Sequence, residues 1–299
     1  MTDRFQAMSI LSTVMDAGSL SAGARALRMP LATVSRKVAE LESALGAELV
    51  LRSARGLALT DTGAAYLEAA RRILEDVAEA ERVAGGEFSK PKGTLAVTAP
   101  IVFGRLHVLP VVVEFLKAHP DVDVRLEQTD RPVSLHEENI DLAVRIGSLP
   151  DSSLIARQLG FVRQVVCASP DYLARCGMPQ TPEELKDHDC ITFGNLMSSR
   201  HWRFGAGRSQ IDVPIRSRLV VNTAEAAIAA AEAGLGVTRV LSYQIADALH
   251  HGRLATALAS FEPEPWPVSL VYPPRGLAPQ KLRAFLGFAA PRISRVLAR

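Results

Sequence analysis

The chain of 299 residues has few cysteines, few aromatic residues and no long apolar run. The three cysteines, Cys167, Cys176 and Cys190, form no CxxC pair and lack metal-ligand spacing, which is typical of a reducing cytoplasm. Aromatic residues make up only 5%, so stacking on unpaired bases is not an obvious binding mode. No run of about 18 apolar residues occurs, and polar residues interrupt the N-terminus, so we expect neither a membrane span nor a signal peptide.

Motifs of catalysis are missing as well. The sequence contains no GxSxG, Walker A or HExxH motif, and the glycines at 205–207 and 234–236 lack the third glycine of a dinucleotide-binding loop. His250 and His251 form an isolated pair that we interpret as solvated rather than metal-binding. Cys167 falls on a predicted strand, which favours a buried structural thiol over a redox sensor. We therefore predict no enzyme activity, no metal site and no cofactor.

Charge is unevenly distributed along the chain, although the formal net charge is only +2. Residues 17–39 and 49–60 contain no acid but several basic residues, whereas residues 61–88 are mainly acidic. Two acid-free basic segments ahead of an acidic one predict a local phosphate-binding surface in the first sixty residues.

The first sixty residues are typical of three helices followed by a two-stranded wing. Apolar residues recur at helical spacing, Ser19 can cap a short second helix, Pro30 suits the first position of a third, and Gly46 ends it. A short helix, a tight turn and a longer helix make a helix-turn-helix, and residues 48–52 and 57–60 would flank the tip of a wing. The alternative is a plain three-helix core with solvated charges, but the acid-free face favours DNA.

The third helix should present its outer face to the major groove of duplex DNA, because Val34 and Val38 mark its buried side. Small residues permit close approach, Arg36 and Lys37 can reach base edges or phosphates, and the wing can hold the DNA backbone. The predicted DNA-binding residues are Ser21, Arg25, Ala32, Thr33, Ser35, Arg36, Lys37, Arg52 and Arg55.

The acidic segment at 61–88 repeats apolar residues every three or four positions, which predicts a helix with a coiled-coil seam. We favour dimerisation through this stripe over packing against its own domain, because an isolated helix needs a partner. Glycines and a Ser-Lys-Pro-Lys-Gly run follow, so we expect a hinge at 89–93.

From residue 94 onward, strand and helix patterns alternate, which predicts parallel sheets with crossover helices. The expected elements include a short helix at 133–138 and a strand beginning at 236–238. Ligands of such sheets bind in the crevice at the carboxyl ends of the strands. Alternatives remain for single residues: Asn222 and Thr223 can simply cap a helix, and Arg145 can sit in an ion pair. The predicted ligand-binding residues are Thr98, Pro100, Ile101, Val102, Phe103, Arg131, Arg145, Gly147, Asn195, Trp202, Asn222, Thr223 and Thr238.

Residues 3–75 closely resemble the N-terminal signature of LysR-type transcriptional regulators, through AGSLSAGARAL, VSRKVAELE, LGAELVLR and LTDTG. Three positions depart from the usual pattern: Gly23 replaces Ala, Leu31 replaces a polar residue, and Pro100 replaces Ser or Thr. The resemblance is looser further on. It implies an all-α winged helix-turn-helix head at 1–60, a dimerisation linker helix at 61–88, and an α/β effector-binding domain at 94–299.

By the same resemblance, the effector-binding domain is similar to a periplasmic binding protein, with lobe one at 94–162 and 267–299 and lobe two at 163–266. The family implies dimers, in most members tetramers, and an effector that is often a small organic acid. We therefore expect a cytoplasmic regulator that binds promoter DNA, with RNA polymerase as a further partner. Rival readings are a transport solute-binding protein, an enzyme of the C-terminal cleft, and a DNA-architectural protein whose lobes are vestigial.

Overall fold

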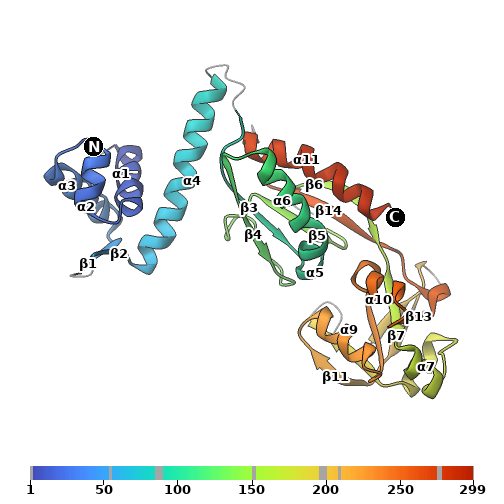
Figure 1. Ribbon diagram of the computed structural model, residues 1–299. Coiled ribbons are helices and arrows are strands. Elements are labelled where there is room, and N and C mark those ends of the chain that lie inside the picture. Colours follow the sequence, from blue (N-terminus) through green and yellow to red (C-terminus); the bar gives the residue numbers. More distant parts are fainter. Residues whose placement is uncertain are drawn as a thin grey trace. The chain divides into compact units, whose positions relative to one another are not determined.

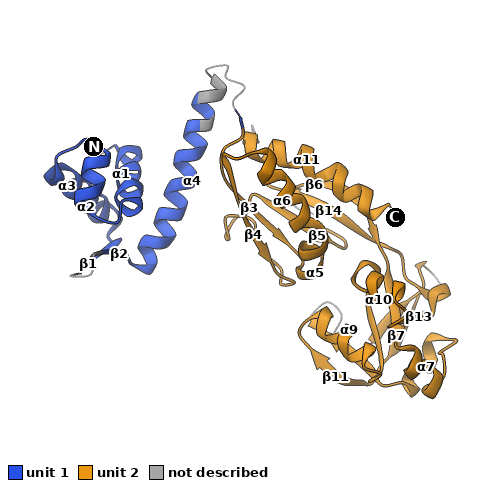
Figure 2. Ribbon diagram, in the orientation of Figure 1, with its two compact units in different colours: residues 1–90 blue, residues 91–299 orange. Residues whose placement is uncertain are grey.

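The computed structural model describes residues 3–53, 56–84, 90–149, 153–194, 201–207, 210–274 and 278–298. The chain divides into two compact units, residues 1–90 and 91–299 (Figures 1 and 2). Among the described residues, no helix is both long enough and apolar enough to cross a membrane.

The first unit begins with the three predicted helices, α1 (Arg4–Asp16), α2 (Leu20–Ala26) and α3 (Leu31–Leu45). Local signals explain their bounds: the Ser19 hydroxyl accepts a hydrogen bond from a backbone N–H of α2, and Gly46 ends α3 in the left-handed conformation at φ 66°. Pro30, predicted as the first helical residue, instead precedes α3 in an extended conformation.

The core of this unit is formed by one face of each helix, with Ile10, Leu11, Val34 and Val38 at most 1% exposed. A side chain at Gly23 would collide with Val14, whose nearest atom lies 2.6 Å from the position of a Cβ. The glycine therefore permits close packing of α2 on α1, which compensates for its low helix propensity.

The wing and the long helix follow. β1 (Val50–Ser53) pairs with β2 (Gly56–Leu59) in an antiparallel ladder, and α4 covers Asp61–Ala84. The Thr60 hydroxyl caps α4 by accepting a hydrogen bond from the Gly63 N–H at 2.8 Å. Leu67 and Ala70 are buried, and Arg71 is paired with Asp16 of α1. The beginning of α4 thus packs against its own unit, as the alternative interpretation expected for this segment.

The second unit contains two five-stranded sheets, each with helices packed on it (Figure 1). The sheet of the first lobe has the order β4-β3-β5-β14-β6, with α6 and α11 packed side by side against it. Its elements are β3 (Gly93–Ala99), α5 (Ile101–Phe103), a π-helical turn (Gly104–Val108), α6 (Leu109–Ala118), β4 (Val122–Gln128), β5 (Leu142–Ile146), β6 (Ile155–Val162), β14 (Trp266–Tyr272) and α11 (Gln280–Leu297).

The sheet of the second lobe has the order β11-β8-β12-β7-β13, and a separate hairpin joins β9 and β10. The described elements of this lobe are β7 (Gln164–Ala168), α7 (Pro170–Cys176), β8 (Cys190–Phe193), β9 (His201–Phe204), β10 (Ile211–Pro214), β11 (Ser217–Val221), α9 (Ala224–Glu232), β12 (Val237–Leu241), α10 (Ala246–His250) and β13 (Ala255–Ala257), with 3₁₀ turns at Pro182–Asp187, Ser242–Ile245 and Ala259–Phe261.

Two expectations for this unit are wrong. The sheets are mixed rather than parallel, since β14 runs antiparallel to both β5 and β6, and β7 runs antiparallel to both β12 and β13. Residues 133–138 form an irregular turn and no helix. In this turn Val133 and Leu135 are buried with Ile140, and Asn139 reverses the chain at a positive φ of 54°.

The chain crosses between the lobes twice. It passes from β6 to β7 through Arg163, and from β13 back to β14 through residues 258–265. The Arg163 guanidinium is paired with the Glu262 carboxylate at 2.9 Å, so the two crossing segments are bound to each other.

Candidate DNA-contacting face and effector pocket

The outer face of α3 carries the residues predicted to bind DNA. Val34, Val38 and Leu41 bury the opposite side in the core. The predicted residues of α2 and α3 divide by exposure. Ser21, Arg25, Ala32 and Arg36 are exposed, and Thr33, Ser35 and Lys37 are half-buried. Arg55 lies outside the described residues, and the structure does not describe the Arg52 side chain.

The two cations of α3 are held differently. The side chain of Arg36 is 66% exposed and is paired with Glu40 at 3.1 Å, whereas that of Lys37 is 18% exposed and lies 4.0 Å from the same carboxylate. Sequence reasoning missed Glu40 because the acid-free stretch was counted only to Ala39. A helical period of i to i+4 is the signal that would have found it.

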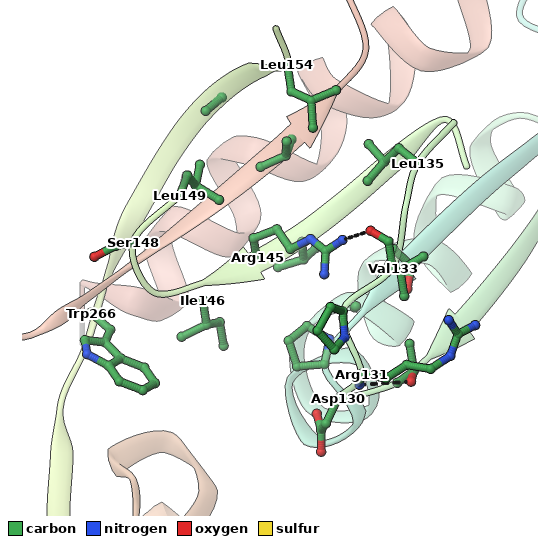
Figure 3. Close-up of a pocket in the computed structure, with 18 of the residues that line it drawn as sticks. Asp130, Arg131, Val133, Leu135, Arg145, Ile146, Ser148, Leu149, Leu154 and Trp266 are labelled. Atoms are coloured by element: carbon green, nitrogen blue, oxygen red, sulfur yellow. Dashed lines mark hydrogen bonds between the residues drawn. The ribbon is translucent and has the colours of Figure 1, made fainter. Parts of the chain in front are cut away.

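A cavity of about 890 Å³ opens between the lobes of the second unit. The first lobe supplies its walls from the ends of β3 and β5 and from residues 129–136, and Trp266 stands at the edge (Figure 3). The second lobe contributes Phe193, Gly194, Leu241, Tyr243 and Gln244.

Four of the residues predicted to bind an effector line this cavity: Thr98, Pro100, Arg131 and Arg145. The other predicted residues that are described do not line it. Val102, Phe103 and Trp202 are buried in hydrophobic cores, and Gly147 lies beside Trp266. Thr223 caps α9, and the Thr238 hydroxyl donates a hydrogen bond to the Ile191 carbonyl at 3.0 Å. The backbone N–H of Ile101 donates to the Asp130 carboxylate at 3.1 Å. Asn222 is exposed, and Asn195 lies outside the described residues.

The two arginines of the cavity differ in their partners. Arg131 pairs with Glu138 and with Glu127, and the hydrogen bond that its guanidinium donates to Glu138 is the largest cause that raises its pKa. Arg145 is half-buried, and loss of water lowers its pKa, an effect that the Glu138 charge only partly opposes. Its guanidinium donates to the Val133 carbonyl, and no carboxylate of the described residues lies within salt-bridge distance (Figure 3). Among the described residues, Arg145 thus differs from Arg131 in having a backbone carbonyl and no carboxylate as its hydrogen-bond partner.

The lobes also meet through an aromatic cluster beside the cavity. The Tyr243 ring of the second lobe lies 5.2 Å from Phe103 and 5.5 Å from His107 of the first, measured between ring centroids. Burial lowers the pKa of His107 and raises that of Tyr243, so both rings stay neutral near pH 7. Arg105 and Glu225 add an ion pair of 2.8 Å between the lobes.

Sequence reasoning missed Tyr243 for a definite reason. The strand was expected to begin at 236–238, which drew attention to Thr238, but β12 continues to Leu241. Tyr243 stands just beyond that carboxyl end and lines the cavity, as the strand-end rule requires once the strand is placed correctly.

Known families match both parts of this chain. Residues 5–64 match the bacterial regulatory helix-turn-helix protein, lysR family, and residues 89–293 match the LysR substrate binding domain. The chain is 31% identical over 290 residues to the uncharacterized HTH-type transcriptional regulator YhjC of Escherichia coli, which covers 96% of this chain and 97% of that protein.

Solved structures agree with the sequence matches. CrgA, a LysR-type transcriptional regulator from Neisseria meningitidis, superposes with a TM-score of 0.62 at 30% identity, over 98% of this chain and 99% of that one. The Vibrio cholerae virulence activator AphB superposes with a TM-score of 0.60 at 25% identity, over 95% and 97%.

Proposed function

The chain belongs to the LysR-type family of transcriptional regulators, and from this premise we propose a role for each of its segments. Residues 1–60 bind promoter DNA, residues 61–88 join two copies of the chain, residues 89–93 act as a hinge, and residues 94–299 bind the controlling effector. Within the last segment, residues 94–162 and 267–299 form one lobe and residues 163–266 the other. The protein works in the cytoplasm as a dimer or tetramer. Once bound to promoter DNA, it contacts RNA polymerase.

On the DNA side, α3 enters the major groove with Arg36 and Lys37 toward bases or phosphates. Arg36 supports this role because its side chain is 66% exposed and that of its partner Glu40 is 32% exposed, so a phosphate can replace the carboxylate at little cost. Ser21 and Arg25 of α2 lie on the surface of the same unit, where they can contact the DNA backbone.

On the effector side, the cavity between the lobes takes a small organic anion. The single observation that carries this proposal is Arg145: a half-buried cation in a largely apolar cavity, with a backbone carbonyl but no described carboxylate as its partner. A carboxylate ligand would supply that partner, while Ile146, Leu149 and Trp266 offer apolar surface to its body (Figure 3). Because the cavity has walls from both lobes, a bound ligand favours one arrangement of the lobes.

The test is fluorescence anisotropy of the full chain with the DNA upstream of its own gene, at two salt concentrations. Specific binding should weaken with salt and with Arg36→Ala or Lys37→Ala. A panel of small carboxylates added to the same assay should contain members that change the affinity. Binding that follows salt but ignores both substitutions would contradict the placement of α3, and folded protein without any specific binding would contradict the regulatory role.

A further inference from the structure

The tip of α3 is apolar. Pro30, Leu31 and Ala32 are all exposed, and Leu31 is 50% exposed at the first position of the helix. No acidic residue lies in the first turn of α3, and no side chain caps it. This tip therefore offers neither a charge nor a side-chain hydrogen-bonding group.

Leu31 is not needed by the fold of its own unit. The buried residues of α3 are Val34, Val38 and Leu41, and the partly buried neighbours that pack on this core include Leu27 and Met29 but not Leu31. A single exposed leucine is ordinary on a protein surface. Leu31, however, stands at the N-terminal end of α3, the part of a recognition helix that contacts base edges. Its exposure therefore places an apolar side chain where bases are read.

We infer that Leu31 reads the C5 methyl group of a thymine at one fixed position of each operator half-site. The inference rests on the proposed function, since it assumes that α3 enters the major groove. Thymine's methyl is the apolar group that the bases present in that groove, whereas the other base edges present hydrogen-bond donors and acceptors. Those groups would lose water without gaining a partner under Leu31, so the same side chain disfavours the other bases.

The exposed cations beside the tip are consistent with this geometry. Arg28 stands just before α3 in a left-handed conformation at φ 53°, and Arg36 stands little more than one turn into the helix. Both side chains can reach phosphates or guanines and so fix the register of the helix. Leu31 would then meet the same base pair in every complex.

The expected size of the effect is modest and measurable. Burying one methyl group changes affinity about fourfold, so a symmetric operator with two half-sites should lose about 15-fold when both methyl groups are removed. Replacement of thymine by deoxyuridine removes only the methyl group and leaves base pairing unchanged.

The experiment first selects operators from a random duplex library with the full-length protein, and then measures Kd for thymine and deoxyuridine versions of the selected site. The wild-type protein should lose about fourfold per half-site at one position. Leu31→Ala should lose little there, and Leu31→Gln should shift the preference at that position towards adenine. Leu45→Ala is the matched control, because it removes an exposed leucine from the other end of the same helix.

The outcomes separate the inference from the proposed function. A consensus that Leu31→Ala recovers unchanged, or one in which deoxyuridine binds as well as thymine at every position, would overturn this inference alone. A library that yields no consensus with folded wild-type protein would overturn the proposed function and the inference with it. Thermal unfolding of each variant verifies that the head is intact, which the exposure of Leu31 leads us to expect.

Discussion

Replacing Arg145 by Met should weaken the binding of anionic effectors strongly while leaving the unliganded protein folded. Methionine keeps most of the apolar stem and removes the guanidinium. The guanidinium of Arg145 is half-buried and donates a hydrogen bond to the Val133 carbonyl. Loss of that bond costs about 1 kcal/mol, which the relief from desolvating a cation offsets. We therefore expect the Tm without ligand to change by no more than about 4 °C.

The effect on binding should be much larger. A hydrogen bond to a charged group contributes about 1.5–3 kcal/mol, so a carboxylate ligand should bind roughly 10- to 150-fold more weakly to the Arg145→Met protein. Thermal shift against a carboxylate panel identifies a ligand, and calorimetry then compares the two proteins. The methyl ester or amide of the same ligand should bind equally weakly to both.

Arg131→Met is the matched control, because Arg131 lines the same cavity but is already paired with Glu138 and Glu127. Its loss should weaken the ligand less than the loss of Arg145. Undiminished binding to Arg145→Met, or a neutral analogue that binds the wild type as tightly as the anion, would refute the reasoning. An equal loss in Arg131→Met would show that the general positive potential, and not Arg145, attracts the ligand.

Four further predictions follow from the structure. Because the Glu40 carboxylate competes with a phosphate for Arg36, Glu40→Gln should raise DNA affinity at low salt; an unchanged or lower affinity in anisotropy titrations would argue against it. Gly63→Ala should destabilise the head by about 1–3 kcal/mol, because its Cβ would lie 1.9 Å from a backbone oxygen. Gly287→Ala should by contrast stabilise the chain, because a Cβ at this position meets nothing within 4 Å. Thermal unfolding of both variants measures these effects. Maleimide at pH 7 should label only Cys176, which is exposed, because burial raises the pKa of the other two thiols to about 12 and keeps them protonated; a second label found by mass spectrometry in native protein would contradict this.

The head could be predicted in detail because its signals are local. The Ser19 cap, the glycine that ends α3 and the stripe of Val34 and Val38 act within one or two turns of helix, so the sequence alone specifies them. The same reasoning identified the two strands of the wing. Arg55, which was predicted to contact DNA, lies outside the described residues. Glu40 was missed only because charge was counted along the chain instead of around the helix.

The sheets of the effector domain were predicted less well because strand direction is not local. β14 is antiparallel to its neighbours because the chain re-enters the first lobe after building the second, and no residue within β14 encodes that return. Residues 133–138 were predicted as a short helix, but Val133 and Leu135 are only two positions apart and pack together in a small cluster with Ile140 and Ala143. Where strand ends were placed correctly, as for Thr98 and Arg145, the predicted residues do reach the cavity.

The two chain crossings between the lobes determine what motion a ligand can govern. Val162 and Trp266, the last and first residues of β6 and β14, are paired in the ladder, and Arg163 is bound to Glu262 just beyond it. The two crossing segments therefore leave the first sheet at adjacent positions. Such a pair bends easily about one axis, but it cannot slide or separate without breaking the ladder. We therefore expect the proposed effector to act mainly by biasing a bend at these two crossings, which requires few backbone torsions to be ordered.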